Sequence, residues 1–217
     1  MILLKVKFWT INVELYQFHT SMGIAHNKVI IGIDYGSKLA GTTVICAAQD
    51  GVLHFFQSTK KQDADKFILD TVELFKPKLI VIDAPLSLPR AYFDDSKDFF
   101  YRACDRKLSA MSPMFLGGLT ARAIKLKSNL EEQKIRVLEG YPKALVEHLG
   151  LKIHYLKKDK TAIPFFLSKL NPSVPIKHNT ISNWHQVDAL LAWIIAYRAT
   201  QKKALKIGNS KEGIIYI

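Results

Sequence analysis

The sequence predicts an α/β fold built on one mixed β-sheet. Residues 29–33 and 78–82 form apolar runs rich in β-branched side chains, which is typical of strands buried on both faces. Each run ends in an acid, Asp34 or Asp83. Between them lie a hairpin signal and a segment of helical periodicity, so strands and helices alternate along the chain as in α/β proteins.

The first half predicts a three-stranded meander followed by a helix. The strand at residues 29–33 leads into a second β-prone run at 42–48. Gln49-Asp50-Gly51 is a hairpin signal that returns the chain as a third strand at 52–58. Apolar residues then recur at helical spacing from Asp63 to Phe75, and Pro77 ends this helix before the strand at 78–82.

The second half predicts mostly helical structure before a further strand. Residues 94–127 are expected to be mainly helical, with breaks near Ser112-Pro113 and Gly117-Gly118. A short strand at 135–138 ends in Glu139, the third acid to follow a predicted strand. A helix then opens at Pro142 and runs to Leu149.

The strongest predicted helix closes the fold. A polar, irregular segment at 151–183 precedes it, and Asn183 with Gln186 three residues later resembles a capping box. The apolar face of this helix consists of Val187, Leu190, Leu191 and Ile194. Asp188 shares a stripe with Ala192 and Ala196, whose small side chains allow the helix to approach the sheet. Asp188 is therefore expected near the strand ends, and residues 214–217 predict a last short strand.

The amino-terminal segment falls outside this pattern. Residues 1–27 are predicted to be an extension, and residues 28–217 a single domain. Because Met22 offers an alternative start shortly before the first buried strand, Met1 to Ser21 are expected to be dispensable for folding.

Composition excludes several classes of protein. The 217 residues are 48% hydrophobic and 23% charged, which is typical of a globular chain. No window reaches the roughly 18 apolar residues of a membrane span, and no secretory signal is recognisable, so a cytoplasmic protein is expected. Two cysteines, Cys46 and Cys104, can form neither a disulfide framework nor a four-cysteine zinc site.

The charge balance favours a polyanionic partner. The net charge is +12, from 31 basic and 19 acidic residues, and nucleic acid is the commonest polyanion. The alternative is a basic protein that binds nothing acidic. The basic runs at 157–160 and 202–203 are themselves more typical of solvated surface than of a binding track.

The strand-end acids predict a metal site. If the strand at 78–82 pairs parallel to the first, Asp34 and Asp83 lie roughly 5 Å apart. Carboxylates that close repel each other unless a divalent cation lies between them. Magnesium suits such ligands, and two metals about 4 Å apart can hydrolyse a phosphodiester. The alternative for Asp34 is an Asx-turn, in which its carboxylate accepts backbone N–H groups.

Several segments carry a family resemblance. IGIDYGSKLAG, IVIDAPLSLP, YRACDRKLS, LEGYPKALVEHLG and HQVDALLAWIIAYR resemble the domain-of-unknown-function family 429, regarded as predicted nucleases of the RNase H-like superfamily. The IGIDYG start also looks like that of bacterial Holliday-junction resolvases. The resemblance, which covers residues 29–217, implies an RNase H-like mixed five-stranded sheet of order 3-2-1-4-5. Helices are expected on both faces, with a helical insertion between strands four and five.

The same resemblance implies a metal-dependent nuclease. By this resemblance Asp34, Asp83 and Asp188 stand at the positions of the family's metal ligands, and two Mg²⁺ or Mn²⁺ ions are the expected cofactors. Glu139 matches a further acid of the family and is a fourth catalytic candidate without an assigned role. The resolvases usually have Glu where this chain has Asp83, whose side chain is shorter by one methylene group.

A second motif is ambiguous between binding and structure. Arg102, Cys104 and Asp105 match the Arg-x-Cys-Asp motif of the family, for which substrate contact and structural support are the alternatives. Arg106 and Lys38 are further candidates for contact with substrate.

Two other functions remain possible from the sequence. One is a catalytically inactive RNase H-like module that binds nucleic acid or a protein. The other is a domain related to actin or sugar-kinase ATPases, because residues 33–37 resemble their first phosphate loop. The second domain and second Gly-rich loop of those proteins do not fit into this chain. The sequence makes no prediction about DNA or RNA, endo- or exonucleolytic cleavage, or oligomeric state.

Overall fold

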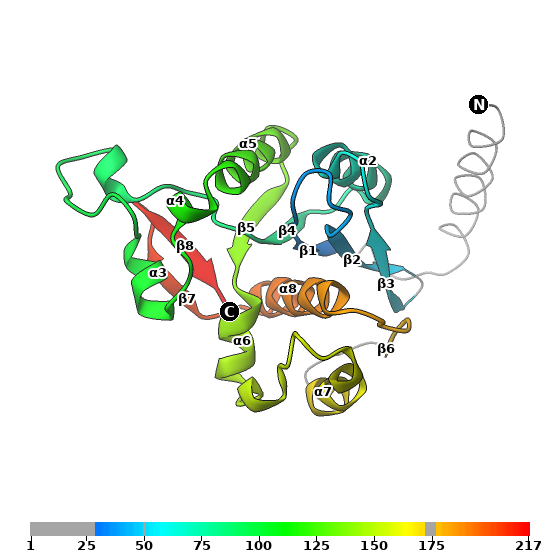
Figure 1. Ribbon diagram of the computed structural model, residues 1–217. Helices are drawn as coiled ribbons and strands as arrows, with labels where there is room; N and C mark the ends of the chain where they lie inside the picture. The colour runs from blue at the N-terminus through cyan, green and yellow to red at the C-terminus, as the bar shows by residue number, and fades with distance from the viewer. Residues whose placement is uncertain (1–28, 50, 172–176) are drawn as a thin grey trace.

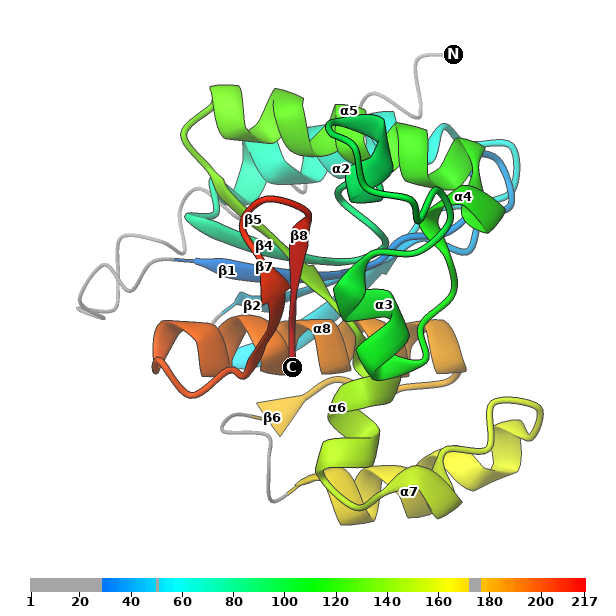
Figure 2. The same cartoon turned by 90° about the vertical axis from the view of Figure 1, so that its left-hand side faces the viewer.

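The computed structural model describes residues 29–49, 51–171 and 177–217, which form one mixed sheet with helices on both faces (Figures 1 and 2). The predicted extension, residues 1–27, and the hairpin residue Asp50 lie outside the described residues, so the structure does not bear on the prediction that Met1 to Ser21 are dispensable. No helix in the described ranges is long and apolar enough to cross a membrane.

The strands are β1 (Ile30–Asp34), β2 (Val44–Gln49), β3 (Val52–Gln57), β4 (Leu79–Asp83), β5 (Arg136–Gly140), β6 (Lys177–His178), β7 (Lys206–Asn209) and β8 (Gly213–Tyr216). The α-helices are α2 (Ala64–Phe75), α3 (Ala103–Leu108), α4 (Pro113–Leu116), α5 (Gly118–Glu132), α6 (Pro142–His148), α7 (Ile163–Leu170) and α8 (Trp184–Thr200). The short 3-10 turns within the described ranges are η1 (Arg90–Tyr92), η2 (Lys152–His154) and η3 (Lys160–Ala162).

The centre of the sheet has the predicted order. The strands run β6-β3-β2-β1-β4-β5-β8-β7, so the series β3-β2-β1-β4-β5 is the predicted 3-2-1-4-5 arrangement. β1, β2 and β3 are antiparallel neighbours, whereas β1, β4 and β5 are parallel. The fold class and strand order expected from the sequence are therefore confirmed.

The sheet is larger than the predicted five-stranded core with its one additional short strand at 214–217. β8 pairs parallel to β5 at the predicted position of the last strand, but its antiparallel partner β7 was missed. A four-residue strand that contains a glycine gives no apolar run to recognise. On the opposite edge, the two-residue β6 pairs with β3. These edge strands widen the sheet without changing the order at its centre.

Two helical predictions need correction. In the insertion between β4 and β5, residues 94–102 are irregular, because aspartates accept backbone N–H groups there, including those of Phe100 and Tyr101 on Asp98. Helical structure begins only at α3, and α5 continues past the predicted end at 127. Conversely, the segment at 151–183 is not wholly irregular, because α7 forms within it and buries Ile163, Phe166 and Leu170.

Side-chain alternation along the strands produces two cores. Ile31 and Ile33 of β1 pack with α2 and α5, whereas Ile30 faces α6, α7 and α8. β4 follows the same rule, with Ile80 and Ile82 on the first face and Leu79 and Val81 on the second. Figure 2 shows the two groups of helices on opposite sides of the sheet.

The closing helix α8 is more buried than one apolar face predicts. Eleven of its residues are buried, because the sheet covers one side and α6 and α7 cover another. Its start agrees with the prediction: Asn183 accepts the backbone N–H of Gln186 at 3.0 Å. The side chain of Gln186, however, accepts the N–H of Ser182 rather than that of Asn183.

α8 passes directly over Gly32, the one glycine of β1. A Cβ atom at this position would lie 2.1 Å from the Trp193 nitrogen and 2.6 Å from the Ala189 oxygen, both backbone atoms of α8. The helix can contact the central strand only where a side chain is missing. This contact places the start of α8 beside the ends of β1 and β4.

We expect Gly32→Ala to lower stability sharply, because neither backbone can move without disturbing both cores. Overpacking of this kind costs roughly 1–3 kcal/mol or more, which corresponds to a fall in melting temperature of at least about 2–4 °C per kcal/mol for a chain of this size. Gly118→Ala is the matched control, since nothing lies within 4 Å of its Cβ position. Thermal melts in which both variants behave alike would contradict the close contact.

Candidate metal centre

Three aspartates converge where the central parallel strands meet α8. Asp34 and Asp83 end β1 and β4 and are direct register partners. Asp34 lies two residues after Gly32, and Asp83 lies two residues after Val81. Gly32 and Val81 both face α8, so the alternation of side chains along the strands turns both carboxylates toward α8 as well. Asp188, in the second turn of α8, completes the group. One oxygen from each carboxylate lies within 4.8 Å of the others.

The cluster is poorly solvated. The side chain of Asp188 is 1% exposed and that of Asp34 is 13% exposed. Burial, followed by the negative charges of Asp34 and Asp188, raises the pKa of Asp83 well above its ordinary value. Burial and the charge of Asp34 also raise the pKa of Asp188 to about 6. Three ionised carboxylates are therefore unfavourable here without a nearby cation, and oxygen donors of this kind suit Mg²⁺ or Mn²⁺.

Neighbouring side chains already contact two members of the cluster. The Tyr155 hydroxyl donates to Oδ1 of Asp188, and the Lys157 ammonium donates to Oδ2 of the same carboxylate. His185 Nδ1 lies 2.8 Å from Oδ2 of Asp34. The hydrogen bond with Asp34 raises the pKa of His185, although burial opposes this effect. Lys157 and His185 thus supply positive charge beside the aspartates.

The Lys157 ammonium binds Oδ2 of Asp188, an oxygen for which a bound divalent cation would compete. Burial lowers the pKa of Lys157, but the Asp188 carboxylate more than offsets this, and the net pKa is raised. Its side chain is half exposed, so the ammonium can leave Asp188 for solvent without passing through the core. A divalent ion that binds Asp188 through Oδ2 must displace it.

We therefore expect Lys157→Met to have opposite effects without and with metal. Without metal, the melting temperature should fall by about 2–4 °C, because the aspartates lose their nearest ammonium. The affinity for Mn²⁺ should rise several-fold, since one competing charge is gone. Differential scanning fluorimetry with a Mn²⁺ titration measures both effects, with the exposed neighbour variant Lys158→Met as control. An unchanged Mn²⁺ affinity in Lys157→Met would show that the two cations do not compete.

Glu139, like Asp34 and Asp83, stands at the end of a strand, but its side chain lies on the opposite face of the sheet from theirs. It pairs with Ile82 and not with Asp83, so it lies one position out of step with the aspartates. Val137 faces the α2 and α5 core, and strand alternation places Glu139 on that same face. Its carboxylate binds Arg102 through both oxygens, at 2.6 Å each, and also accepts the Leu86 N–H.

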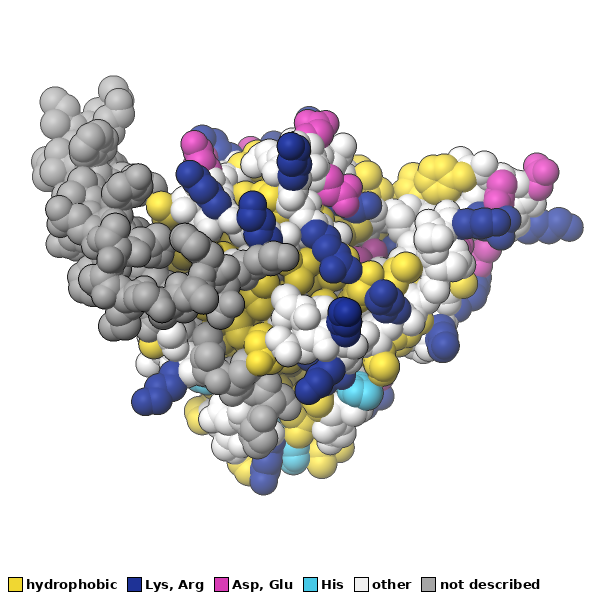
Figure 3. Space-filling view, turned by 180° about the vertical axis from the view of Figure 1, so that it is seen from behind, with side chains coloured by type: hydrophobic (Ala, Val, Ile, Leu, Met, Phe, Trp, Pro, Cys, Tyr) yellow, Lys and Arg dark blue, Asp and Glu magenta, His cyan; other side chains and the backbone are white. Residues whose placement is uncertain are grey.

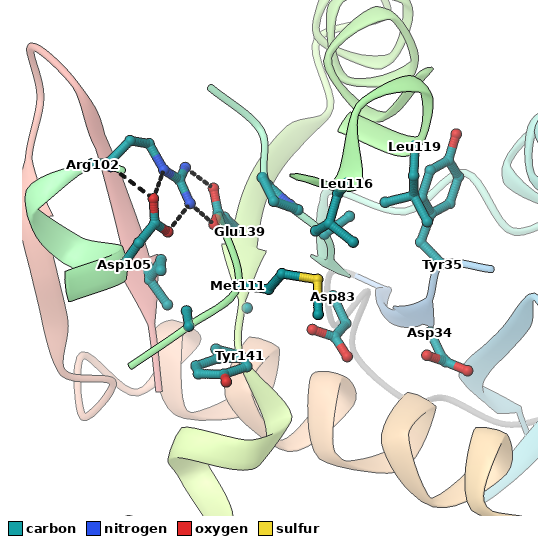
Figure 4. A pocket seen from close by; sticks show the side chains of 15 residues that line it. Asp34, Tyr35, Asp83, Arg102, Asp105, Met111, Leu116, Leu119, Glu139 and Tyr141 are labelled. Atoms are coloured by element: carbon teal, nitrogen blue, oxygen red, sulfur yellow. Dashed lines mark hydrogen bonds and ion pairs between the residues drawn. The ribbon is translucent and has the colours of Figure 1, made fainter. Parts of the chain in front are cut away.

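Arg102 is the centre of a buried ionic network. The side chain is 1% exposed, and its guanidinium donates to Asp105, Glu139 and Ser87 (Figure 4). These contacts account for all five N–H donors of the guanidinium. Asp105 also accepts the Arg102 backbone N–H at the start of α3. The geometry agrees with the structural alternative for this motif, because no donor of Arg102 is left to contact a substrate.

The other predicted contact residues lie on the surface. Arg106 pairs with Asp98 and stacks over Tyr101, while Lys38 pairs with Asp63 at 3.1 Å. None of these five side chains lines the space beside the aspartates. Cys104, in contrast, is buried in the core on the α8 side of the sheet.

A hollow of about 230 Å³ opens beside the aspartates (Figure 4). Asp34 and Asp83 lie on one side and the Arg102 network on another. Apolar side chains from the insertion, together with Tyr141, complete the wall. Among the described residues, the hollow is lined by Asp34, Asp83, Glu139, Arg102 and Asp105, and Asp188 is not part of its lining. Glu139 and Arg102 bind each other at its edge.

Sequence reasoning missed three residues of the centre. His185 lies three positions before Asp188, and helical spacing could have indicated that both reach the same site. Tyr155 and Lys157 come from the segment between η2 and η3, which has no periodicity. Lys157 belonged to a basic run interpreted as solvated surface, whereas the structure places its ammonium on a buried carboxylate.

Comparison of the chain with protein-family models and with curated proteins identified no relative. No protein-family model matches the chain, and no curated protein matches it. The fold and the carboxylate cluster consequently rest on the structure, and membership of a nuclease family remains a prediction from the sequence segments quoted above.

Proposed function

We propose that the protein is a metal-dependent nuclease that hydrolyses phosphodiester bonds of DNA or RNA. The observation that carries this proposal is the convergence of Asp34, Asp83 and Asp188 within 4.8 Å on an RNase H-like sheet. Carboxylates at the ends of parallel strands supply hard oxygen ligands and leave room for a phosphate.

The three aspartates would hold Mg²⁺ or Mn²⁺, and we propose that two ions bind there. Bound there, the metal supplies an activated water and stabilises the charge on the leaving oxygen. Asp34 and Asp83 are fixed by the strand register, and Asp188 is fixed by the contact of α8 with Gly32. Rigid elements of this kind keep ligands in place better than loops do.

Positive side chains around the centre support an anionic substrate. The Lys157 ammonium and the His185 ring lie against Asp188 and Asp34, so both are beside the place where a phosphate would bind. Over the wider surface, the face seen in Figure 3 carries many Lys and Arg side chains and few acids, in keeping with the net charge of +12. Such a surface attracts polyanions before any specific contact forms.

The proposal is tested by incubating the protein with plasmid, single-stranded DNA, RNA and branched junctions in Mg²⁺ or Mn²⁺. The triple variant Asp34→Asn, Asp83→Asn, Asp188→Asn serves as the control for contaminating nucleases. We expect cleavage of at least one substrate by the parent, none in a chelator and none by the triple variant. Steep salt-dependent binding with no metal-dependent cleavage would instead identify an inactive binding module.

A further inference from the structure

The hollow beside the aspartates combines a charged side with an apolar one. Asp34 and Asp83 form the charged side, while Met111, Leu116 and Leu119 come from the insertion between β4 and β5. In Figure 4 the side chain of Met111 reaches toward Asp83, Leu116 lies next to Met111, and Leu119 lies next to Tyr35 on the side of Asp34. A site for a phosphate or an ion alone would not need this apolar wall.

The apolar wall is incompletely covered. Met111 is 61% exposed, and Leu116 and Leu119 are half-buried. Exposed apolar side chains that rim a polar cleft are typical of ligand-binding surfaces. Methionine adapts its shape to flat or irregular ligands because its side chain is flexible and its sulfur polarizable.

The hollow also offers a hydrogen-bonding edge. Tyr141 follows β5 and lines the hollow, and Figure 4 draws no hydrogen bond between its hydroxyl and the other lining side chains. Its hydroxyl can both donate and accept. The volume of about 230 Å³ lies below the roughly 300–1,000 Å³ of sites for drug-sized ligands, so one small planar group fits better than a whole nucleotide.

We propose that this hollow receives one unpaired nucleobase of the strand being cleaved, held between Met111, Leu116 and Leu119 and read at its edge by Tyr141. The inference rests on the proposed nuclease function, because a phosphate at the aspartates brings the attached nucleoside to the neighbouring space. A base inside a duplex must first leave its stack, which costs a few kcal/mol. The substrate class is therefore single-stranded, or locally unpaired, DNA or RNA.

The experiment compares the parent with Met111→Glu. A glutamate at this exposed position adds charge to the wall without opening the core. Phe115→Glu is the matched control, since Phe115 is 65% exposed on the same insertion and does not line the hollow. Met111→Leu keeps an apolar side chain and should restore the parent behaviour.

The measured quantity is the affinity for fluorescent single-stranded DNA and RNA oligonucleotides in Ca²⁺, beside the same strands in duplex form and with abasic sites. We expect the parent to prefer single strands with bases by about 10-fold or more, and Met111→Glu to lose this preference. The Phe115→Glu variant should keep it. Whichever of DNA and RNA binds more tightly identifies the source of the base.

A second readout separates this inference from the proposed function. Bis(p-nitrophenyl) phosphate is a diester without a nucleobase, so its hydrolysis by the parent in Mn²⁺ reports the aspartate centre independently of the base site, and Phe115→Glu should hydrolyse it as the parent does. Equal oligonucleotide affinity of the parent and Met111→Glu, or equal affinity for abasic and normal strands, would overturn the base site while leaving the nuclease proposal intact. Absence of any diester hydrolysis by the parent would overturn the nuclease proposal and the inference with it.

Discussion

Asp188→Asn should retain the melting temperature of the parent, or exceed it, in the absence of metal, and should lose the stabilisation that Mn²⁺ gives the parent. Burial raises the pKa of Asp188 to about 6, so its charge at neutral pH is less favourable in the folded protein than in the unfolded chain. Asparagine removes the charge and keeps an oxygen that can accept from Tyr155. Loss of a direct metal ligand should reduce Mn²⁺ affinity by roughly 10-fold or more.

The pH dependence of this variant has a defined sign. Because the folded pKa of Asp188 lies above the unfolded value of 3.8, the parent gains stability as the pH falls from above 6 toward 4. The advantage of Asp188→Asn should therefore be largest above pH 6 and vanish near pH 4. Asp70→Asn, which removes an exposed charge from α2, is the control and should show no such trend. Equal Mn²⁺-induced shifts in the parent and Asp188→Asn would exclude Asp188 as a ligand.

Arg102→Met should be the most destabilising of the substitutions considered. The methionine leaves the Asp105 and Glu139 carboxylates buried without their guanidinium, and breaking a buried pair in this way costs roughly 3–5 kcal/mol. For a chain of this length we expect the melting temperature to fall by about 10 °C or more, or the variant to be insoluble.

Two further variants make that result specific. Arg106→Met removes an arginine whose side chain is 61% exposed, four residues later, and should change the melting temperature little. Arg102→Lys keeps the charge but cannot form the five hydrogen bonds, so its stability should lie between those of the parent and Arg102→Met. Chemical denaturation measures all three. If Arg102→Met melted within about 2 °C of the parent, the network would not be a structural element.

The central sheet was predictable because its strands carry strong signals. The apolar runs before Asp34 and Asp83 and the hairpin at Gln49 have patterns that few other structures produce. The edge strands β6 and β7 are short and polar. β6 pairs with β3, which is far away along the chain, and β7 pairs with the neighbouring β8 but has no apolar run of its own. The strand count was therefore too low although the central order was right.

The orientation of the site residues depended on register. Asp34 and Asp83 both face α8, which carries Asp188, because β1 and β4 are in register and both alternate with a period of two. Glu139 follows a strand in the same way, yet its partner is Ile82, and this offset by one residue turns it to the opposite face. Sequence alone does not give the register, which is why Glu139 was grouped with the aspartates.

Calorimetric titration of Mn²⁺ into the parent and into Asp83→Asn tests the carboxylate cluster most directly. The titration measures binding itself, without requiring the correct nucleic acid. We predict saturable binding by the parent and an affinity reduced at least about 10-fold in Asp83→Asn, because a ligand at the centre of the cluster is lost. Absence of binding by the parent, or equal affinity in the two proteins, would contradict a metal centre formed by Asp34, Asp83 and Asp188.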